Sequence, residues 1–353
     1  MNLWDVEQYC ALVKESALRF EDWDKLAGKK IVLSGGSGMI LSYLIDVVML
    51  HNRMTGDGIS IVSTGRSTER FWKRFSCWAG EKLQVVQWDV SEPAPESPLF
   101  DCADYVIHGA STTHPRDYAA KPISTVMTNV MGASGMLEIA GRRQGSRFVL
   151  MSSVEIYGDN RTGHAAFAEA DCGYINCNTL RAGYTEAKRV SEALCQAYRA
   201  ERGQDAVILR IPRSYGPTLL ETDSKALSQF MANALRGEDI VLKSEGMQLF
   251  SYAYVPDVVQ GILYMLTRAQ DGEAYNLADG GSDVRLRDLA GMIAACAGTK
   301  VVFDLPDAQE RKGFSAAGVA LMDSAKLRAL GWQAQYDMER GVAQTMEILR
   351  RVR

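Results

Sequence analysis

Histidine is scarce and cysteine is scattered in this chain of 353 residues, which has four histidines and seven cysteines. The closest cysteine pair, Cys172 and Cys177, does not have the spacing of a common zinc site. His108 and His114 lack a third ligand at a suitable spacing. The sequence therefore predicts no metal centre, and it predicts reduced cysteines in a cytoplasmic protein.

A basic excess and a long apolar run are also missing. The formal net charge is −4, which gives no general attraction to nucleic acid or to an anionic membrane surface. No apolar run approaches the roughly 18 residues that a membrane span needs. The first ten residues, MNLWDVEQYC, have no basic region followed by an apolar stretch, so no secretory signal is expected. We expect neither nucleic acid nor a membrane as a partner.

Short apolar runs alternate with helical stretches along much of the chain. We expect strands at 30–34, 59–64, 85–90, 104–108, 147–152 and 206–211. Continuous apolar strands separated by helices are typical of a parallel sheet that is covered on both faces. The predicted fold class is therefore α/β, with a Rossmann-type doubly wound parallel sheet.

Three parts are predicted along the chain. Residues 1–28 carry apolar side chains at helical spacing and form an N-terminal helical leader, which could brace the sheet or a subunit contact. Residues 29–212 form the dinucleotide-binding domain. Glycines and prolines then break the pattern, so residues 213–353 are predicted to form mainly a smaller C-terminal α/β substrate lobe, interleaved with the sheet near 250–278.

A glycine turn, Gly35-x-x-Gly38, follows the first expected strand and opens the next helix. Such a turn lets the backbone approach a pyrophosphate, and the helix N-terminus favours its charge. Gly35, Gly38, Met39 and Ile40 are the predicted dinucleotide contacts. Leu41 stands where a third glycine is expected, so the motif is incomplete, and a merely structural tight turn is the alternative.

The residues after the second and third strands bear on the choice of dinucleotide. No acidic residue ends the second strand, and Arg66 follows it. An acid would bind a ribose 2′-hydroxyl and indicate NAD, whereas an arginine accommodates a 2′-phosphate, so NADP stays open beside NAD. A solvated surface arginine is the alternative. Asp89 and Val90 are predicted to lie against the adenine, unless Asp89 is a simple helix cap.

Tyr184 and Lys188 lie four residues apart, on one face of a predicted helix. An ammonium beside a phenol favours the phenolate, so we expect the pKa of Tyr184 to move from about 10 toward neutrality. The phenolate could take a proton from a sugar hydroxyl while nicotinamide accepts a hydride from the same carbon. The Tyr-x-x-x-Lys spacing is common by chance, but it becomes specific behind a glycine turn and the serine-rich strand end at Ser153.

Five segments together resemble the extended short-chain dehydrogenase/reductase family: SGGSGMI (34–40), HGAS (108–111), SSVEIYG (152–158), YTEAK (184–188) and RSYGP (213–217). Two longer blocks, 108–132 and 175–195, are most similar to the UDP-glucuronate decarboxylases of that family. The resemblance implies that Ser153 hydrogen bonds to the reacting hydroxyl and that Tyr184 is the base. It also implies that Lys188 holds both Tyr184 and the nicotinamide ribose.

The resemblance further implies a cofactor site that includes Gly109, Ala110, Ser111 and Asn129. Glu155 stands where decarboxylases and dehydratases have a carboxylate, with an ordinary surface glutamate as the alternative. The implied function is decarboxylation of UDP-glucuronate through transient oxidation at C4, with NAD as a tightly held catalyst. Alternatives are 4,6-dehydration or epimerisation of a nucleotide sugar, an NADPH-consuming reductase, and a non-catalytic dinucleotide-binding or sensing protein.

Three positions depart from the family pattern. Val154 stands where dTDP-glucose dehydratases have an Asp, Arg213 where an Asn is usual, and Phe250 where an Arg commonly contacts the nucleotide. The predicted substrate contacts are Ser153, Arg181, Arg213 and Lys225. Either Arg213 or Lys225 could supply the positive charge missing at position 250.

Family members generally pair through two helices that form a four-helix bundle. The corresponding helices here lie near 121–142 and 184–201. The resemblance therefore implies a homodimer.

Overall fold

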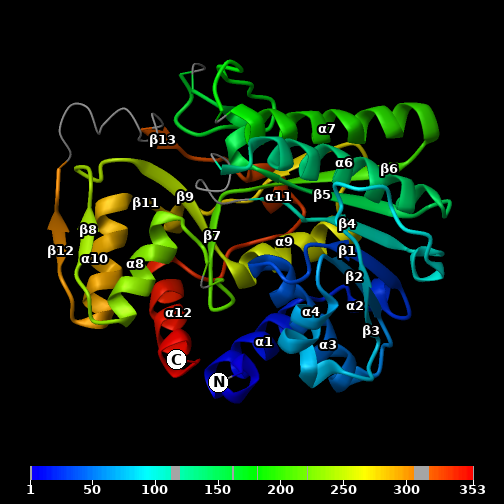
Figure 1. Ribbon diagram of the computed structural model, residues 1–353, viewed down its shortest axis with the longest axis horizontal. Helices are drawn as coiled ribbons and strands as arrows, with labels where there is room; N and C mark the ends of the chain where they lie inside the picture. The colour runs from blue at the N-terminus through cyan, green and yellow to red at the C-terminus, as the bar shows by residue number, and fades with distance from the viewer. Residues whose placement is uncertain are drawn as a thin grey trace.

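The computed structural model describes residues 2–112, 120–160, 163–180, 182–220, 222–305 and 318–352. A large sheet with helices on both faces makes up one side of the molecule, and a smaller lobe lies beside it (Figure 1). None of the helices in these ranges is both long enough and apolar enough to cross a bilayer.

The large sheet has seven parallel strands in the order β10-β6-β5-β4-β1-β2-β3. Their bounds are β1 Lys30–Ser34, β2 Ser60–Gly65, β3 Leu83–Gln87, β4 Tyr105–His108, β5 Arg147–Ser153, β6 Asp205–Ile211 and β10 Ala274–Asn276. The order reverses between β1 and β4, where Ser34 pairs with His108. Doubly wound sheets bind dinucleotides outside the carboxyl ends of the strands at this reversal. The predicted Rossmann-type α/β fold is confirmed.

The third strand differs from the sequence prediction of 85–90, since β3 begins at Leu83 and ends at Gln87. Trp88 and Val90 are buried beyond its end, in the cluster that also contains Met136 of a neighbouring helix. Their apolar character reflects this packing and not membership of the strand.

Helices cover both faces of the sheet because its side chains alternate between the two faces. Ile31 and Leu33 point into one core cluster and Val32 into the other. The first cluster lies under α3 (Met39–Thr55), α4 (Thr68–Phe75) and α9 (Val255–Thr267), and the second under α6 (Pro122–Gly141) and α7 (Ala182–Arg202). Parallel sheets buried on both faces read as continuous apolar runs, which explains why these strands were visible in the sequence.

The smaller lobe contains two short sheets and the helices that pack on them (Figure 1). One sheet joins β7 (Arg213–Tyr215), β9 (Leu249–Tyr254), β11 (Asp283–Arg285) and β13 (Val319–Ala320), and the other joins β8 (Ile240–Leu242) and β12 (Val301–Phe303). The helices of this lobe are α8 (Ala226–Leu235), α10 (Leu286–Ala297) and α12 (Met338–Val352), whereas α11 (Ala325–Ala329) packs against β10 of the large sheet. Short 3-10 turns occur at Ser76–Trp78, Pro98–Phe100 and Gly280–Ser282.

The N-terminal leader consists of the 3-10 turn η1 (Leu3–Asp5) and the helices α1 (Glu7–Arg19) and α2 (Trp23–Leu26). Its anchor on α3 is Asp46, which is fully buried. The Asp46 carboxylate accepts hydrogen bonds from the indole of Trp4 at 3.1 Å and from the hydroxyl of Tyr9 at 2.5 Å. Arg74 forms an ion pair with the same carboxylate. The leader therefore braces the helical layer of the sheet, one of the two roles that the sequence left open.

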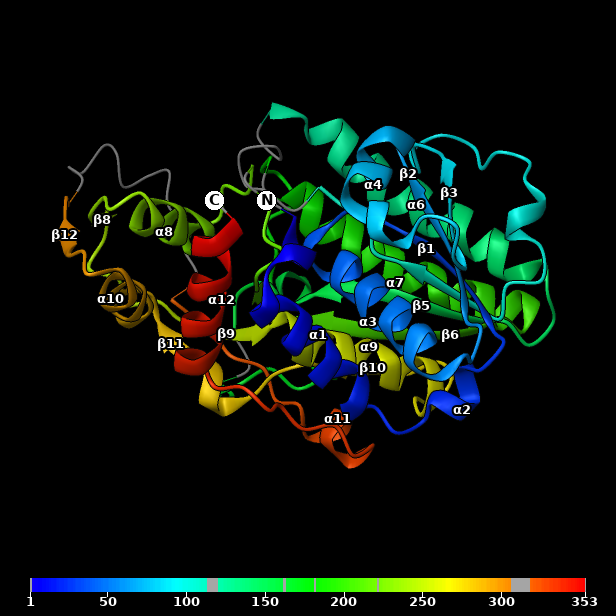
Figure 2. The same cartoon turned by 90° about the horizontal axis from the view of Figure 1, so that it is seen from below.

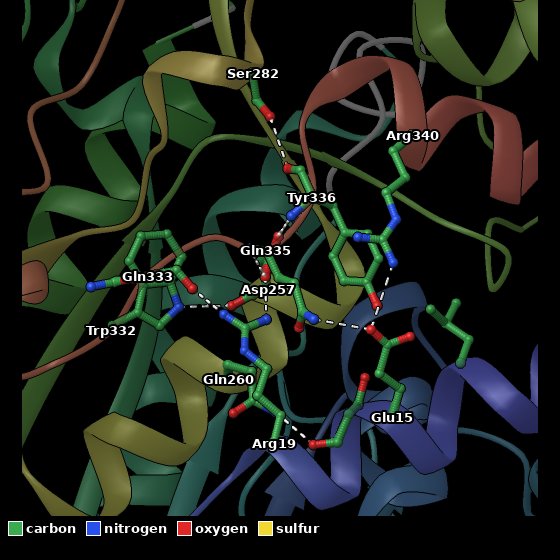
Figure 3. Close-up of polar contacts among 12 residues, drawn as sticks. Glu15, Arg19, Asp257, Gln260, Ser282, Trp332, Gln333, Gln335, Tyr336 and Arg340 are labelled. Atoms are coloured by element: carbon green, nitrogen blue, oxygen red, sulfur yellow. Dashed lines mark hydrogen bonds and ion pairs between the residues drawn. The ribbon is translucent and has the colours of Figure 1, made fainter.

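A second contact joins the leader to the segment that precedes α12 (Figure 3). Arg19 lies 2.5 Å from the buried carboxylate of Asp257 on α9, and it also donates to the carbonyl of Gln333. Asp257 accepts the backbone N–H of Gln335 at 3.0 Å, and the Gln335 side chain donates to Glu15 at 3.0 Å. Helix α1 thus lies between α9 and α12, as Figure 2 shows from below.

Candidate active site

The glycine turn and the end of β4 are in direct contact at the point where the strand order reverses. Gly35 has a φ of +87°, and a Cβ there would lie 2.8 Å from the backbone nitrogen of Ala110. Gly38 caps α3 without a side-chain hydrogen bond, so no side chain competes for the first N–H groups of this long helix. These features fit a dinucleotide pyrophosphate. The predicted contacts that meet here are Gly35, Gly38, Met39, Ile40, Gly109 and Ala110.

Ser111 and Asn129 continue this side of the site. The Ser111 hydroxyl donates to the Asn129 side chain at 2.9 Å, and the Asn129 amide donates to the Thr125 carbonyl at 2.8 Å. One turn further along α6, a Cβ at Gly132 would lie 2.6 Å from the His108 ring. The Asn-x-x-Gly pattern therefore lets α6 pack closely against the end of β4.

His108 has a structural role. It is completely buried, and its Nδ1 shares a hydrogen bond of 2.8 Å with the Ser34 hydroxyl. Burial and, to a smaller extent, the charge of Lys188 lower the pKa of His108 to about 3, so the ring is neutral at physiological pH. Within the described ranges, no three His, Cys, Asp or Glu side chains form a cluster that could hold a metal ion. His114 lies outside those ranges.

Arg66, Asp89 and Val90, the predicted adenine-side residues, lie beyond the ends of β2 and β3. Arg66 is exposed, and Val90 is buried against α6. Asp89 accepts hydrogen bonds from the backbone N–H of Ser91 at 3.1 Å and from its hydroxyl at 2.7 Å. Burial raises the pKa of Asp89, but these hydrogen bonds and the charge of Arg66 outweigh burial and lower it. Asp89 therefore stabilises a tight turn, which replaces the helix cap that the sequence offered as its alternative role.

Ser153 and Tyr184, two of the predicted catalytic residues, come together from β5 and α7. Ser153 ends β5, and its oxygen accepts the Glu155 backbone N–H at 3.2 Å. The serine proton is then available to the Tyr184 phenol, with which Ser153 is hydrogen bonded. Both side chains are buried. This geometry presents a hydroxyl and a phenol side by side at the carboxyl edge of the sheet.

Lys188 lies one helical turn beyond Tyr184 and points toward β5. Its ammonium donates to the Met151 carbonyl at 2.8 Å, and the residue is only 2% exposed. Burial lowers the pKa of Lys188 to about 8, although the nearby charge of Glu192 opposes this shift. Lys188 is therefore a buried cation close to its titration point, and not a solvated surface lysine.

The expected decrease in the Tyr184 pKa is not what the protein alone shows. Burial raises the pKa of Tyr184 to about 12; the Ser153 hydrogen bond opposes this shift and the charge of Glu155 adds to it. The prediction was wrong in direction because it counted the lysine charge and neglected the desolvation of the phenolate. The phenol of the protein alone is consequently protonated at neutral pH.

Glu155 and Arg213 form an ion pair beside Ser153 and Tyr184. Glu155 lies on the 3-10 turn η4 (Val154–Tyr157), and its carboxylate is 3.3 Å from the Arg213 guanidinium. The guanidinium lies over the ring of Phe250, with its Cζ 3.7 Å from the ring centroid. Two of the departures from the family pattern, at positions 213 and 250, are therefore in contact with each other.

The two other predicted substrate contacts are Lys225 and Arg181. Lys225 precedes α8, and its ammonium lies 3.8 Å from the Asp223 carboxylate. Arg181 lies outside the described residues. The positive charge beside Glu155 is supplied by Arg213.

Sequence reasoning missed a buried ion pair that supports the catalytic strand. Glu192 lies one turn beyond Lys188 on α7, 2.7 Å from the guanidinium of Arg210 on β6. The Glu192 carboxylate also accepts the hydroxyl of Ser152 at 2.5 Å. Arg210 donates to the Tyr157 hydroxyl at 2.9 Å, so the pair links β5, β6, α7 and η4. A single charge inside the apolar run 206–211 was the available signal.

The comparisons with known proteins agree with this geometry. The model of the NAD dependent epimerase/dehydratase family matches residues 31–278. UDP-glucuronic acid decarboxylase 1 of Danio rerio is 30% identical over 327 residues, which is 92% of this chain and 73% of that protein. UDP-glucuronic acid decarboxylase 6 of Arabidopsis thaliana is 34% identical over 244 residues, or 69% of this chain and 67% of that protein. The match to the Xenopus tropicalis decarboxylase 1, 34% identical over 67% of this chain, spans only 53% of that protein.

Solved structures show the same fold at lower identity. A dTDP-glucose 4,6-dehydratase from Streptomyces venezuelae has a TM-score of 0.77 at 23% identity, over 91% of this chain and 97% of that chain. A UDP-glucuronic acid 4-epimerase from Bacillus cereus has a TM-score of 0.77 at 19% identity, over 92% of this chain and 100% of that chain. Since the family match covers well over half of the sequence, the chain belongs to the NAD-dependent epimerase/dehydratase family of enzymes.

Proposed function

We propose that this enzyme decarboxylates a UDP-linked hexuronosyl group, most simply UDP-glucuronate, by transient oxidation at C4. The observation that carries the proposal is the Ser153–Tyr184 hydrogen bond at the carboxyl edge of the sheet, with Lys188 behind it and Glu155 beside it. The names of the curated relatives, at 30–34% identity, support the choice of substrate.

In this proposal NAD, when bound, would supply a hydride acceptor for C4. Gly35 and Gly38 would hold its pyrophosphate at the start of α3. Tyr184, once ionised, removes the proton of the C4 hydroxyl, and Ser153 donates a hydrogen bond that stabilises the phenolate. Lys188 stabilises the same negative charge from the helix turn below.

The decarboxylation step follows from the ketone at C4. That ketone is β to the C6 carboxylate, so the C5–C6 bond can break with its electron pair accommodated by the C4 carbonyl oxygen. CO₂ leaves, C5 takes up one proton, and C4 then regains its hydrogen and becomes an alcohol again. The net change is loss of CO₂ and gain of one proton, with the cofactor regenerated.

The residue beside Glu155 favours decarboxylation over 4,6-dehydration. Val154 is buried and apolar, so it can neither give nor take a proton. A dehydration needs both an acid and a base to remove water across two carbons. Decarboxylation needs a proton only after CO₂ has gone.

A product-mass assay tests the proposal. The protein is incubated with NAD and, separately, with UDP-, dTDP-, GDP- and CDP-sugars, and each product is weighed by mass spectrometry. We expect UDP-glucuronate to lose the mass of CO₂. Loss of water from a hexose would indicate dehydration instead, and an unchanged mass with altered stereochemistry would indicate epimerisation. No turnover of any sugar by protein that binds NAD would refute the proposal.

We further propose that the enzyme is a homodimer, paired through α6 and α7. These two helices pack side by side along one edge of the molecule (Figure 1). Their outer faces expose Ile123, Met127, Met131 and Val190. Light scattering should give twice the mass of one chain, and Ile123→Glu should reduce it toward one; a monomeric wild type would refute dimerisation.

A further inference from the structure

Arg213 is held in an unusual setting at the start of β7. It pairs in register with Tyr252 of the parallel strand β9. Side chains two residues apart in a strand share a face, so Phe250 is the diagonal neighbour of Arg213 on the same surface. The guanidinium lies over the Phe250 ring, with its Cζ 3.7 Å from the ring centroid, and this contact restricts where the guanidinium can lie.

The hydrogen-bonding capacity of Arg213 is only partly used. One terminal nitrogen, Nη2, lies 3.3 Å from the Glu155 carboxylate. The other, Nη1, is buried and has no hydrogen-bond partner among the described residues. An unpaired buried N–H on a charged group is unfavourable. The Arg213 side chain as a whole stays 27% exposed, and its planar fork matches a carboxylate.

The position of the Arg213 guanidinium in the site limits which anionic group of a substrate it can bind. Glu155 is two residues from Ser153, and its charge acts on Tyr184. Arg213 thus lies at the end of the site where the reacting C4 hydroxyl would bind. In a nucleotide sugar the diphosphate is attached at C1, across the ring from C4, whereas C6 is attached to C5, the direct neighbour of C4. The anionic group adjacent to C4 is a C6 carboxylate.

We infer that Arg213 is a specificity-determining residue that binds the C6 carboxylate of a hexuronosyl substrate and so selects uronosyl nucleotides over hexosyl ones. The inference rests on the proposed function and adds to it the residue that distinguishes uronosyl from hexosyl substrates. Phe250 and Glu155 are positioning residues in this arrangement, since both contact the guanidinium and hold it in place.

The test compares two ligands that differ only at C6. Calorimetry measures the affinity of the NAD-saturated protein for UDP-glucuronate and for UDP-glucose in the Tyr184→Phe background, which should not turn over the substrate, with Arg213 unchanged, Arg213→Gln or Arg213→Lys. We expect Arg213→Gln to weaken UDP-glucuronate binding by roughly 10- to 100-fold, the loss of a hydrogen bond to a charged group. The affinity for UDP-glucose should stay unchanged, and Arg213→Lys should keep only part of the preference because it lacks the planar fork.

A matched control and a relocated charge sharpen the test. Arg285 is an exposed arginine on β11 of the same sheet, and Arg285→Gln should change neither affinity. In the double variant Arg213→Asn with Phe250→Arg, the charge comes from the diagonal position and should restore much of the preference for the uronate. If the double variant folds but does not prefer UDP-glucuronate over UDP-glucose, the preference does not come from a charge between β7 and β9.

The outcomes separate this inference from the proposed function. A wild type that binds neither nucleotide sugar refutes both. A wild type that converts UDP-glucuronate, with Arg213→Gln weakening both ligands equally or neither of them, refutes the inference alone. Selective loss of UDP-glucuronate binding in Arg213→Gln supports it.

Discussion

The Lys188 ammonium donates to the Met151 carbonyl at 2.8 Å, which ties α7 to β5 two residues before Ser153. The lysine is thereby held inside the protein, where burial lowers its pKa to about 8. Keeping that charge in the interior destabilises the folded state.

Lys188→Met should therefore change how stability depends on pH. The folded-state pKa of about 8 lies below the ordinary 10.5, so the unfolded protein binds more protons between these pH values. Below pH 8 the buried charge costs about 3 kcal/mol, and this cost disappears as the pH rises toward 10.5. Urea unfolding should show a higher free energy of unfolding for the variant than for the wild type at pH 7, and this difference should be smaller at pH 9.5. A difference that is constant over this range would contradict the assigned pKa.

Tyr184→Phe should remove turnover while leaving the fold intact. Loss of the acid–base group should lower kcat by roughly 10²- to 10⁴-fold, with NAD affinity and Tm close to those of the wild type. Tyr198→Phe is the matched control, because Tyr198 lies on the same helix and donates to Glu138 near the surface. Comparable activity of the two variants would show that Tyr184 is not the base.

Glu192→Gln should destabilise the protein strongly. The substitution leaves Arg210 buried without its counter-charge, which costs about 3 kcal/mol in a buried pair. Glu138→Gln is the control, since Glu138 pairs with Arg202 on the solvent side of α7 and should matter much less. Urea unfolding of both variants measures the contrast, and equal effects would argue against a supporting role for the buried pair.

Arg19→Ala should loosen the attachment of the leader. The variant leaves the buried Asp257 carboxylate with only backbone donors, and we expect a loss of about 2 kcal/mol in the free energy of unfolding. Lys14→Ala, at an exposed position on the same helix, should leave stability unchanged. Hydrogen exchange should also show faster exchange in α1 of Arg19→Ala; unchanged exchange would refute the bracing role of this contact.

Most of the sheet could be predicted from the sequence because strands buried on both faces are continuous apolar runs. The Gly35 turn could be placed for a similar reason, since it follows the first of these strands directly. The end of β3 could not, because the buried Trp88 and Val90 extend the apolar pattern past the last strand residue.

The chemistry of the site was less accessible than its residues. The spacing of Tyr184 and Lys188 identified the pair, but the direction of the Tyr184 pKa depends on burial, which spacing does not report. Glu192 and Arg210 meet only because α7 packs against β6. The contact between Arg213 and Phe250 depends in the same way on the pairing of β7 with β9.

Isotope transfer at C4 tests the central claim most directly. The wild-type enzyme, supplied with substoichiometric NAD, is given UDP-glucuronate that carries deuterium at C4, and the product is weighed by mass spectrometry. We expect a product that has lost CO₂ and kept the deuterium at C4, over many turnovers for each NAD. A decarboxylated product whose deuterium has exchanged with water, or no product from folded enzyme that binds NAD, would contradict transient oxidation at C4.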